Sequence, residues 1–339
     1  MFNTIGHIFS LTTFGESHGT AIGGVIDGCP SGLNIDFELI KSELRRRSCG
    51  RKATSLRNEA DEVEFLSGIT EGVTLGTPIA FIVRNIDCKS SDYDTLKDIF
   101  RPSHADYTYF VKYGVMDYRG GGRASGRTLL PCVVAGAIAK QILALSGVSV
   151  STCVTRIGER CSQGFSPSEI EGILLDVGAA GDTVGAEVSG VIHNVPQGIG
   201  EPVFHKFQAE LASAMFSINA AKGFEYGEGF RAASMRGTEC NDAFIANSDG
   251  GIDIATNHSG GIQGGITNGK DVTFKVAFKP IPSVMAAQNT VNKLGECVKI
   301  KIGGRHDICV VPRVLPIVEA MAAMVTLDFI MLKKTNSIL

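Results

Sequence analysis

Two long segments of this chain are apolar on nearly every helical face, and they limit its possible folds more than any other feature. Thr128–Leu145 and Leu315–Lys333 both repeat apolar residues at helical spacing, without a continuous polar stripe. Helices of this kind must be covered on all sides, which predicts a helical layer inside a soluble protein. Pro316, Glu319 and Asp328 interrupt the second segment, so we interpret it as a buried helix and not as a membrane span.

Shorter runs of alternating apolar residues predict the strands that would cover these helices. The runs lie at Thr4–Leu11, Ala21–Ile26, Val63–Leu66, Thr77–Val83, Ala186–His193, Val272–Phe278 and Val298–Ile302. Two further helices are expected, one capped by Asp36 and one over His205–Ile218. Because the strands come in runs and do not alternate singly with helices, we expect an α+β fold. It would be a sandwich with the long apolar helices layered between two mainly antiparallel β-sheets.

Composition narrows the class of protein further. The formal net charge of −3 argues against nucleic-acid binding, and the 44% of hydrophobic residues supplies a large core. Nine cysteines without a C-x-x-C pair indicate free thiols in a reducing compartment, with no metal site. The first residues lack the basic and apolar regions of a signal peptide, so we expect a cytoplasmic protein without a membrane partner.

No feature of the sequence marks a boundary between domains. We find no linker, low-complexity tract or repeat with a convincing period, so residues 1–339 are predicted to form a single domain. Residues 161–182 are the least patterned part and are expected to form a surface excursion.

Residues 15–19 read Gly-Glu-Ser-His-Gly and fit the G-x-S-x-G nucleophile elbow of α/β-hydrolases. That motif would make Ser17 the nucleophile of a serine hydrolase, with His18 beside it. An elbow needs several strands before it and a helix directly after it, whereas only fourteen residues precede Gly15 and Thr20 opens a predicted strand. We therefore keep the hydrolase as a remote alternative, beside a tight turn held by local hydrogen bonds.

Three basic, glycine-rich stretches suggest binding of an anion. The run from Arg45 to Arg57 contains Arg47, Arg51 and Lys52, and it is equally well a solvated helix end or a trap for a polyanion. The second stretch extends from Arg101 and His104 to a triple glycine followed by Arg123, Ala124, Ser125 and Arg127, immediately before the first apolar helix. Backbone N–H groups and the helix N-terminus there would form an anion site, and Gly303–Asp307 repeats the arrangement before the last helix.

Two other stretches qualify as ligand loops without a dinucleotide fingerprint. The glycine run Asn257–Gly265 precedes a strand and not a helix, and Lys279–Ser283 carries two prolines that end a strand. Histidines, a carboxylate and many arginines on such loops, without metal-ligand spacing, indicate acid/base chemistry on a multiply charged anion.

Taken together, these motifs resemble the chorismate synthase family. The resemblance runs almost end to end through TTFGESHG, RPSHADYTY, DYRGGGR, GDTVG, GEPVF, SINAAKGFEYG, SGGIQGGITNG, FKPIPS and GRHD. It implies helices between two sheets, a homotetramer and reduced FMN as cofactor. The implied reaction is the anti 1,4-elimination of phosphate from 5-enolpyruvylshikimate 3-phosphate to give chorismate, with no net redox change.

The resemblance also implies a role for each matching residue. His18 would protonate the leaving phosphate, His104 would keep the reduced flavin correctly protonated, and Asp307 with Ser17 would relay a proton from flavin N5. The substrate would be held by Arg47, Arg101, Arg127 and Arg305, with Arg51 or Lys52 completing the basic rim. FMN would contact Arg123, Ala124, Ser125, Asn219, Ala220, Gly264, Lys279, Pro280, Ile281, Pro282, Ser283 and Arg305.

Some residues depart from the family pattern, and two other functions stay open. Ala124 and Thr128 remove a hydroxyl and a carboxylate beside the phosphate loop, which implies weaker flavin or substrate binding, and Ile308 replaces a frequent proline. A flavin- or phosphate-binding module, or a flavin reductase without lyase activity, is the alternative function. Without a dinucleotide fingerprint we expect NADPH to act only as an indirect reductant.

Overall fold

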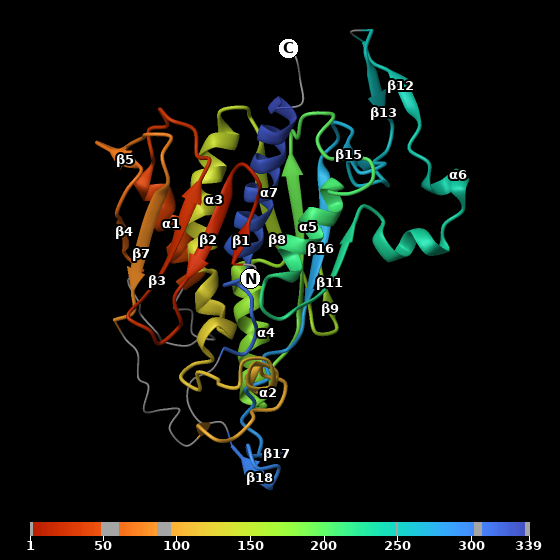
Figure 1. Cartoon of the computed structure of the whole chain (residues 1–339). Coiled ribbons are helices and arrows are strands. Elements are labelled where there is room, and N and C mark those ends of the chain that lie inside the picture. The colour runs from red at the N-terminus through yellow and green to blue at the C-terminus, as the bar shows by residue number, and fades with distance from the viewer. Residues whose placement is uncertain (1–2, 49–60, 87–95, 249, 302–306, 336–339) are drawn as a thin grey trace.

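Two five-stranded antiparallel sheets dominate the computed structural model, which describes residues 3–48, 61–86, 96–248, 250–301 and 307–335 (Figure 1). The first sheet has the order β1 (Thr4–Ile5), β2 (Ser10–Phe14), β3 (Ala21–Asp27), β7 (Ile79–Arg84) and β4 (Val63–Phe65). The second has the order β11 (Ala221–Tyr226), β16 (Val272–Phe278), β10 (Ala186–His193), β8 (Ser149–Ile157) and β9 (Arg160–Cys161). The remaining strands pair as β5 (Ile69–Thr70) with β6 (Val73–Thr74), β12 (Phe244–Ala246) with β13 (Ile252–Ile254), β14 (Ile262–Gln263) with β15 (Ile266–Thr267), and β17 (Gln288–Val291) with β18 (Cys297–Ile300).

The helices divide into a central pair and several that surround it. The α-helices are α1 (Phe37–Ser48), α2 (Asp106–Tyr113), α3 (Leu130–Ala144), α4 (Pro167–Ala179), α5 (Phe207–Phe216), α6 (Gly237–Cys240) and α7 (Leu315–Thr335). Short 3-10 turns are η2 (Gly122–Ala124), η3 (Gly126–Leu129) and η4 (Gly229–Ser234). In Figure 1 α3 and α7 lie side by side, with the first sheet on one side and the second on the other. Mixed helices and antiparallel sheets confirm the α+β class.

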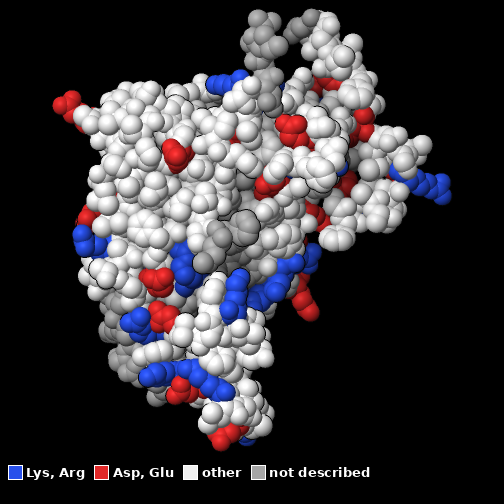
Figure 2. Space-filling model, in the orientation of Figure 1, with Lys and Arg blue, Asp and Glu red and all other residues white. Residues whose placement is uncertain are grey.

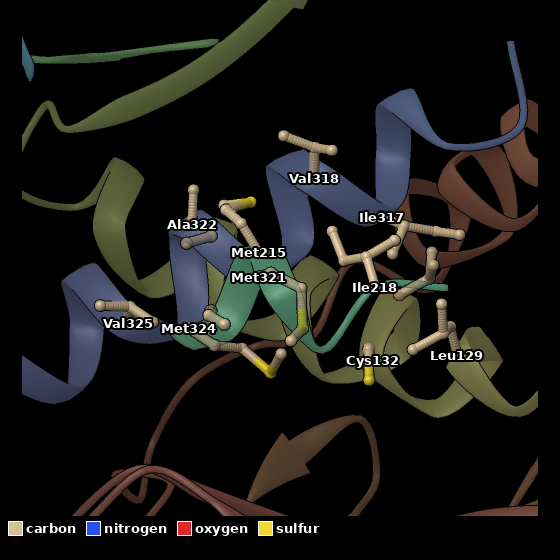
Figure 3. Close-up of a cluster of buried hydrophobic side chains, with 14 of the residues drawn as sticks. Leu129, Cys132, Met215, Ile218, Ile317, Val318, Met321, Ala322, Met324 and Val325 are labelled. Carbon is tan, nitrogen blue, oxygen red and sulfur yellow. The ribbon is translucent and has the colours of Figure 1, made fainter. Parts of the chain in front are cut away.

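The two apolar segments form the core helices. Both are long and apolar enough to cross a membrane, but 83% and 78% of their most apolar windows are buried inside the protein. Figure 3 shows how α5 and α7 meet the start of α3, with Met215, Ile218, Ile317 and Met321 packed together. The core therefore joins elements far apart in the sequence through one cluster of apolar side chains.

Gly136 allows α3 and α7 to approach closely. A Cβ atom on this residue would lie 2.2 Å from the Ala320 Cβ and 2.4 Å from the Ala320 Cα, so a side chain there would push the helices apart. We expect Gly136→Ala to lower the free energy of unfolding by ~1–3 kcal/mol, although alanine is the better helix former. Gly172→Ala on α4 is the matched control: no atom lies within 4 Å of its added methyl group, so it should raise stability by ~0.5–1 kcal/mol. Urea denaturation measures both, and equal effects would contradict the close approach.

The first predicted strand is wrong in its extent. Thr4–Leu11 is divided into β1 and β2, because Gly6 takes a φ of +89° and the chain then turns toward α7. The backbone N–H groups of residues 7–9 donate to the buried Asp328 carboxylate at 2.7 to 3.0 Å and are not used by a neighbouring strand. The long-range contact with Asp328 replaces the sheet pairing that alternation predicted.

The surface excursion expected at residues 161–182 is correct in its position, since most of these residues are exposed, but wrong in its structure. This region contains α4, which buries Ile170, Ile173 and Leu174. Ser166 accepts a hydrogen bond from the Glu169 N–H, and the Glu169 carboxylate accepts one from the Ser166 N–H, which makes a complete capping box. The S-x-x-E pattern of Ser166 and Glu169, which predicts the start of a helix, is present in the sequence and was missed. Helices α2 and α6 and strands β5, β6, β8, β9, β11–β15 and β17 were not predicted either. Strands β3, β4, β7, β10, β16 and β18 were predicted, as was the cap of α1 by Asp36, which accepts a hydrogen bond from the Leu39 N–H.

Candidate active site

A cleft of about 870 Å³ opens where the ends of several elements meet. Its wall is formed by the end of α1, the η2–η3 loop, the segment after α5, and residues 279 and 281–283. Its floor is apolar and continues the core cluster of Figure 3, through Leu129, Cys132, Ile218, Ile317 and Met321. Figure 2 shows Lys and Arg side chains gathered in the lower half of the visible face, while the upper half carries few. The cleft thus combines an apolar floor with a basic wall.

The triple glycine forms the turn before η2 that the sequence predicted as an anion site. Residues 120–122 all have positive φ, and Gly120 and Gly121, which have no side chain, present backbone to the cleft. The Ser125 side chain accepts a hydrogen bond from the Arg127 N–H, and Thr128 Oγ1 donates to the Ser125 carbonyl at 2.7 Å. Asn219 Nδ2 donates to the Ala124 carbonyl at 2.9 Å. This loop is therefore held by bonds to its own hydroxyls and to the segment after α5.

The Gly-Glu-Ser-His-Gly motif lies directly behind the same glycine turn. Ser17 Oγ is 3.2 Å from His18 Nδ1 and donates to the Gly120 carbonyl at 3.3 Å, and both side chains are buried. A Cβ atom on Gly120 would lie only 2.0 Å from the His18 ring. Strand β3 begins at Ala21, so the helix that a nucleophile elbow requires is absent from this part of the described chain.

Gly120 should be sensitive to a single methyl group. We expect Gly120→Ala to lower turnover by about tenfold or more, because the added Cβ displaces the His18 ring and small misplacements in an active site are costly. Gly114→Ala is the control: Gly114 has a φ of +72° as well, but no atom lies within 4 Å of the added group. Steady-state turnover normalised to folded protein separates the two. Equal losses would assign the effect to backbone strain alone.

His104 is held as a neutral ring. Its Nδ1 lies 3.0 Å from the Pro102 carbonyl, which can only accept, so Nδ1 carries the proton. Its Nε2 lies 3.2 Å from Ser283 Oγ. Burial, followed by the nearby charge of Arg101, lowers the pKa of His104. The ring is therefore uncharged near pH 7, with Nε2 as the exchangeable position.

Arginines from distant parts of the chain meet around Asp61. Arg47 Nη1 and Arg127 Nη1 lie 3.3 Å and 3.0 Å from its two carboxylate oxygens. The cleft is lined by six cationic and three acidic side chains, and each acid is paired with an arginine, Asp106 with Arg101 and Asp307 with Arg313. The described wall therefore retains a positive excess suited to a polyanion.

Most of the predicted site residues come together in this cleft. Its lining includes Arg47, Arg101, His104, Arg123, Ala124, Ser125, Arg127, Asn219, Ala220, Lys279, Ile281, Pro282, Ser283 and Asp307. Ser17 and His18 lie behind its wall, as described above. Two predicted flavin contacts lie outside it: Pro280 packs near Gly185, and Gly264 turns the β14–β15 hairpin. Arg51, Lys52 and Arg305 fall outside the described residues.

Sequence reasoning did not single out several polar residues of the site, three of which contact its predicted arginines or Asp307. Asp61 and Arg313 line the cleft, and Asn85 Oδ1 accepts a hydrogen bond from Arg127 Nε at 2.7 Å. The sequence held one signal for Asp61, which is its position as an acidic residue after the basic run that ends at Arg57.

Across the described ranges no group of three or more His, Cys, Asp or Glu side chains could hold a metal ion, and the cysteines there are free thiols.

Comparison with known proteins gives one consistent result. Residues 9–331 match the family model described as chorismate synthase. The chain is 52% identical to the chorismate synthase of Christiangramia forsetii over 99% of both proteins. It is 50% identical to that of Bacteroides thetaiotaomicron over 100% of both. A crystal structure of chorismate synthase is similar with a TM-score of 0.76 and 28% identity, covering 97% of this chain and 93% of that one.

The site and these matches define the class of protein as a lyase. The chain belongs to the chorismate synthase family, whose enzymes make chorismate. Nothing in the comparisons favours a serine hydrolase, a binding module or a flavin reductase.

Proposed function

We propose that the cleft binds reduced FMN and 5-enolpyruvylshikimate 3-phosphate together and catalyses anti 1,4-elimination of phosphate. The observation that carries the proposal is that motifs spread from residue 15 to residue 307 meet on or behind the wall of one basic cleft. The substrate carries two carboxylates and a phosphate, which suits a cleft lined by five arginines and one lysine in a chain of negative net charge. The cleft volume of about 870 Å³ is near the upper end for ligand pockets, so it suits two ligands.

The residues present fit a flavin. The apolar floor suits an aromatic ring system, and Arg123 with the η2–η3 backbone suits a phosphate. Ala220 lines the wall with a φ of +69°, a strained conformation of the kind that concentrates at ligand sites. When bound, reduced FMN would supply electron density transiently to the breaking C3–O bond, with no net redox change. We propose Arg123, Ala124, Ser125, Asn219, Ala220, Lys279, Ile281, Pro282, Ser283 and Arg305 as its contacts. The contacts of Pro280 and Gly264, which do not line this cleft, stay predictions.

We propose that the two histidines hold and move protons at different places. His18, behind the glycine turn, would donate a proton to the leaving phosphate. The neutral His104 would keep its Nε2 available toward the flavin, and Ser17 with Asp307 would relay a proton from the flavin N5 position. Arg47, Arg101 and Arg127 would bind the substrate and stabilise the charge that develops on phosphate. Arg51 or Lys52 would complete this rim.

The remaining features of the proposal follow the family. We propose a single domain with the sandwich arrangement of α3 and α7 between the sheets, assembled as a homotetramer in the cytoplasm. NADPH would serve only as an indirect reductant. Chorismate formation under anaerobic conditions, with NADPH in place of a chemical reductant, would contradict that last point.

An anaerobic assay tests the function directly. The protein is supplied with reduced FMN and 5-enolpyruvylshikimate 3-phosphate, and we expect chorismate and phosphate to appear in equal amounts. If FMN binds but no product forms, the lyase function is contradicted and only the function of a flavin-binding module remains.

A fluorophosphonate probe tests the hydrolase alternative. Labelling of Ser17 would contradict the role proposed for the Gly-Glu-Ser-His-Gly motif in a lyase. The labelled peptide must be sequenced, because Ser151 Oγ lies 2.9 Å from His193 Nε2, and His193 Nδ1 lies 2.9 Å from Asp271 Oδ2. Ser151 lies on β8, His193 on β10 and Asp271 immediately before β16, and none of the three lines the cleft. Labelling at Ser151 would therefore carry no information on Ser17.

A further inference from the structure

Asp61 joins two arginines that reach the cleft from different elements. We propose that Asp61 is a positioning residue, whose carboxylate holds the guanidinium groups of Arg47 and Arg127 in the geometry that binds the substrate anion. The inference rests on the substrate role proposed above for these two arginines.

The geometry of the three side chains supports a bridge. Asp61 Oδ1 lies 3.0 Å from Arg127 Nη1, and Asp61 Oδ2 lies 3.3 Å from Arg47 Nη1. The Asp61 side chain is 2% exposed, and those of Arg47 and Arg127 are 11% and 9% exposed. Arg127 has a second anchor at Asn85, 2.7 Å from its Nε. One carboxylate thus fixes the end of α1 relative to the η2–η3 loop.

Charge explains why the bridge is needed. Two buried guanidinium groups this close together repel each other, and the repulsion is strong where water is excluded. One shared carboxylate neutralises half of that charge and leaves the other half for a ligand. Arg47 is the less satisfied partner: its other bond, to the Gly126 carbonyl, is also 3.3 Å long, and its buried Nε has no hydrogen-bond partner. A substrate anion would complete its bonding.

A competing role for Asp61 predicts the opposite result. If the carboxylate merely occupied the place of the substrate anion, its removal would strengthen substrate binding. If it positions the arginines, its removal lets them separate and weakens binding. The sign of the change in KM therefore distinguishes the two roles.

The test is the anaerobic assay on Asp61→Asn, which keeps the shape of the side chain and removes its charge. We expect KM for 5-enolpyruvylshikimate 3-phosphate to rise about tenfold, the scale of one charge-assisted hydrogen bond, with kcat within about threefold of the wild-type value. A lower KM would overturn the proposal by showing competition, and an unchanged KM would overturn it by showing no role. Asp176→Asn is the control, since it removes a carboxylate from an exposed ion pair with Arg160. Its KM should be that of the wild type.

Asp61→Glu separates position from charge and keeps the test valid if Asp61→Asn does not fold. It retains the negative charge but moves the carboxylate by one methylene group, so a raised KM with an unchanged thermal midpoint supports positioning. A wild-type KM would show that charge alone matters and would overturn the proposal. Arg127→Gln tests the underlying substrate role separately. If Arg127→Gln leaves KM unchanged, the arginine clamp and this inference fall together; if it raises KM while both Asp61 variants do not, only this inference falls.

Discussion

His18→Ala and His104→Ala should each lower turnover at least ~100-fold, which is the usual scale for loss of an acid/base group. His18 lies against the Gly120 turn, and His104 is a neutral ring with its Nε2 beside Ser283. The FMN contacts proposed above do not include either histidine. The affinity for FMN should therefore change much less than turnover. Single-turnover kinetics in the anaerobic assay, together with a flavin titration, measures the two effects separately.

His193→Ala is the control for these variants. His193 is partly exposed on the second sheet and pairs with Asp271, so its removal should leave turnover unchanged. Near-normal turnover in both the His18 and the His104 variants would remove the histidines from the mechanism. A parallel loss of flavin binding would instead assign them a role in binding.

The elements that the sequence predicted well are those whose pattern is local. The apolar runs of α3 and α7 and the alternation of β3, β10 and β16 depend on which face of each element is buried, and that periodicity is visible in the chain itself. The predicted strand Thr4–Leu11 was wrong in its extent because a carboxylate more than three hundred residues away accepts the N–H groups of residues 7–9. Periodicity holds no information about such a partner.

The same distinction applies to the site. The loops with glycine, arginine and histidine could be recognised from their composition, and the structure brings most of them to one cleft. Asp61, Asn85 and Arg313 could not be assigned, because their roles come from contacts with Arg127, Arg47 and Asp307 across the fold. Gly264 was carried over from a motif alone; it lies in the β14–β15 turn and does not line the cleft, so its flavin contact stays a prediction.

A cluster of four charged side chains lies between α1, α3 and α7; Glu43, Glu319 and Lys140 are largely buried, and Arg46 is partly exposed. Arg46 forms two hydrogen bonds of 2.7 Å with Glu319, and Lys140 Nζ lies 2.6 Å from Glu319 and 2.9 Å from Glu43. Thr152 Oγ1 of β8 donates to Glu319 at 2.7 Å. Burial disfavours ionisation of Glu319, but the bonds from Arg46 and the charge of Lys140 outweigh it, so its pKa is lowered. The cluster also anchors α1 immediately before Arg47.

Glu319→Ala should lower the free energy of unfolding by ~3 kcal/mol or more, because it leaves the mostly buried Lys140 without its nearest counter-charge. Glu64→Ala is the matched control: Glu64 also binds an arginine through two bonds, but both side chains are about half exposed, so the loss should be below ~1 kcal/mol. Urea denaturation measures both variants. Comparable losses would mean that burial adds nothing to the cost of removing a carboxylate.

The pH dependence of stability gives an independent check on the same cluster. Because the folded pKa of Glu319 lies below its unfolded value, the unfolded chain binds the proton more readily. The stabilisation is therefore complete above about pH 4.5, the ordinary pKa of a glutamate, and is lost as pH falls through the folded pKa. Glu319→Gln should flatten this part of the stability curve, whereas the wild type and Glu64→Ala should retain it. A curve unchanged by Glu319→Gln would show that other carboxyl groups control acid unfolding, and that the charges around Glu319 compensate one another without adding stability.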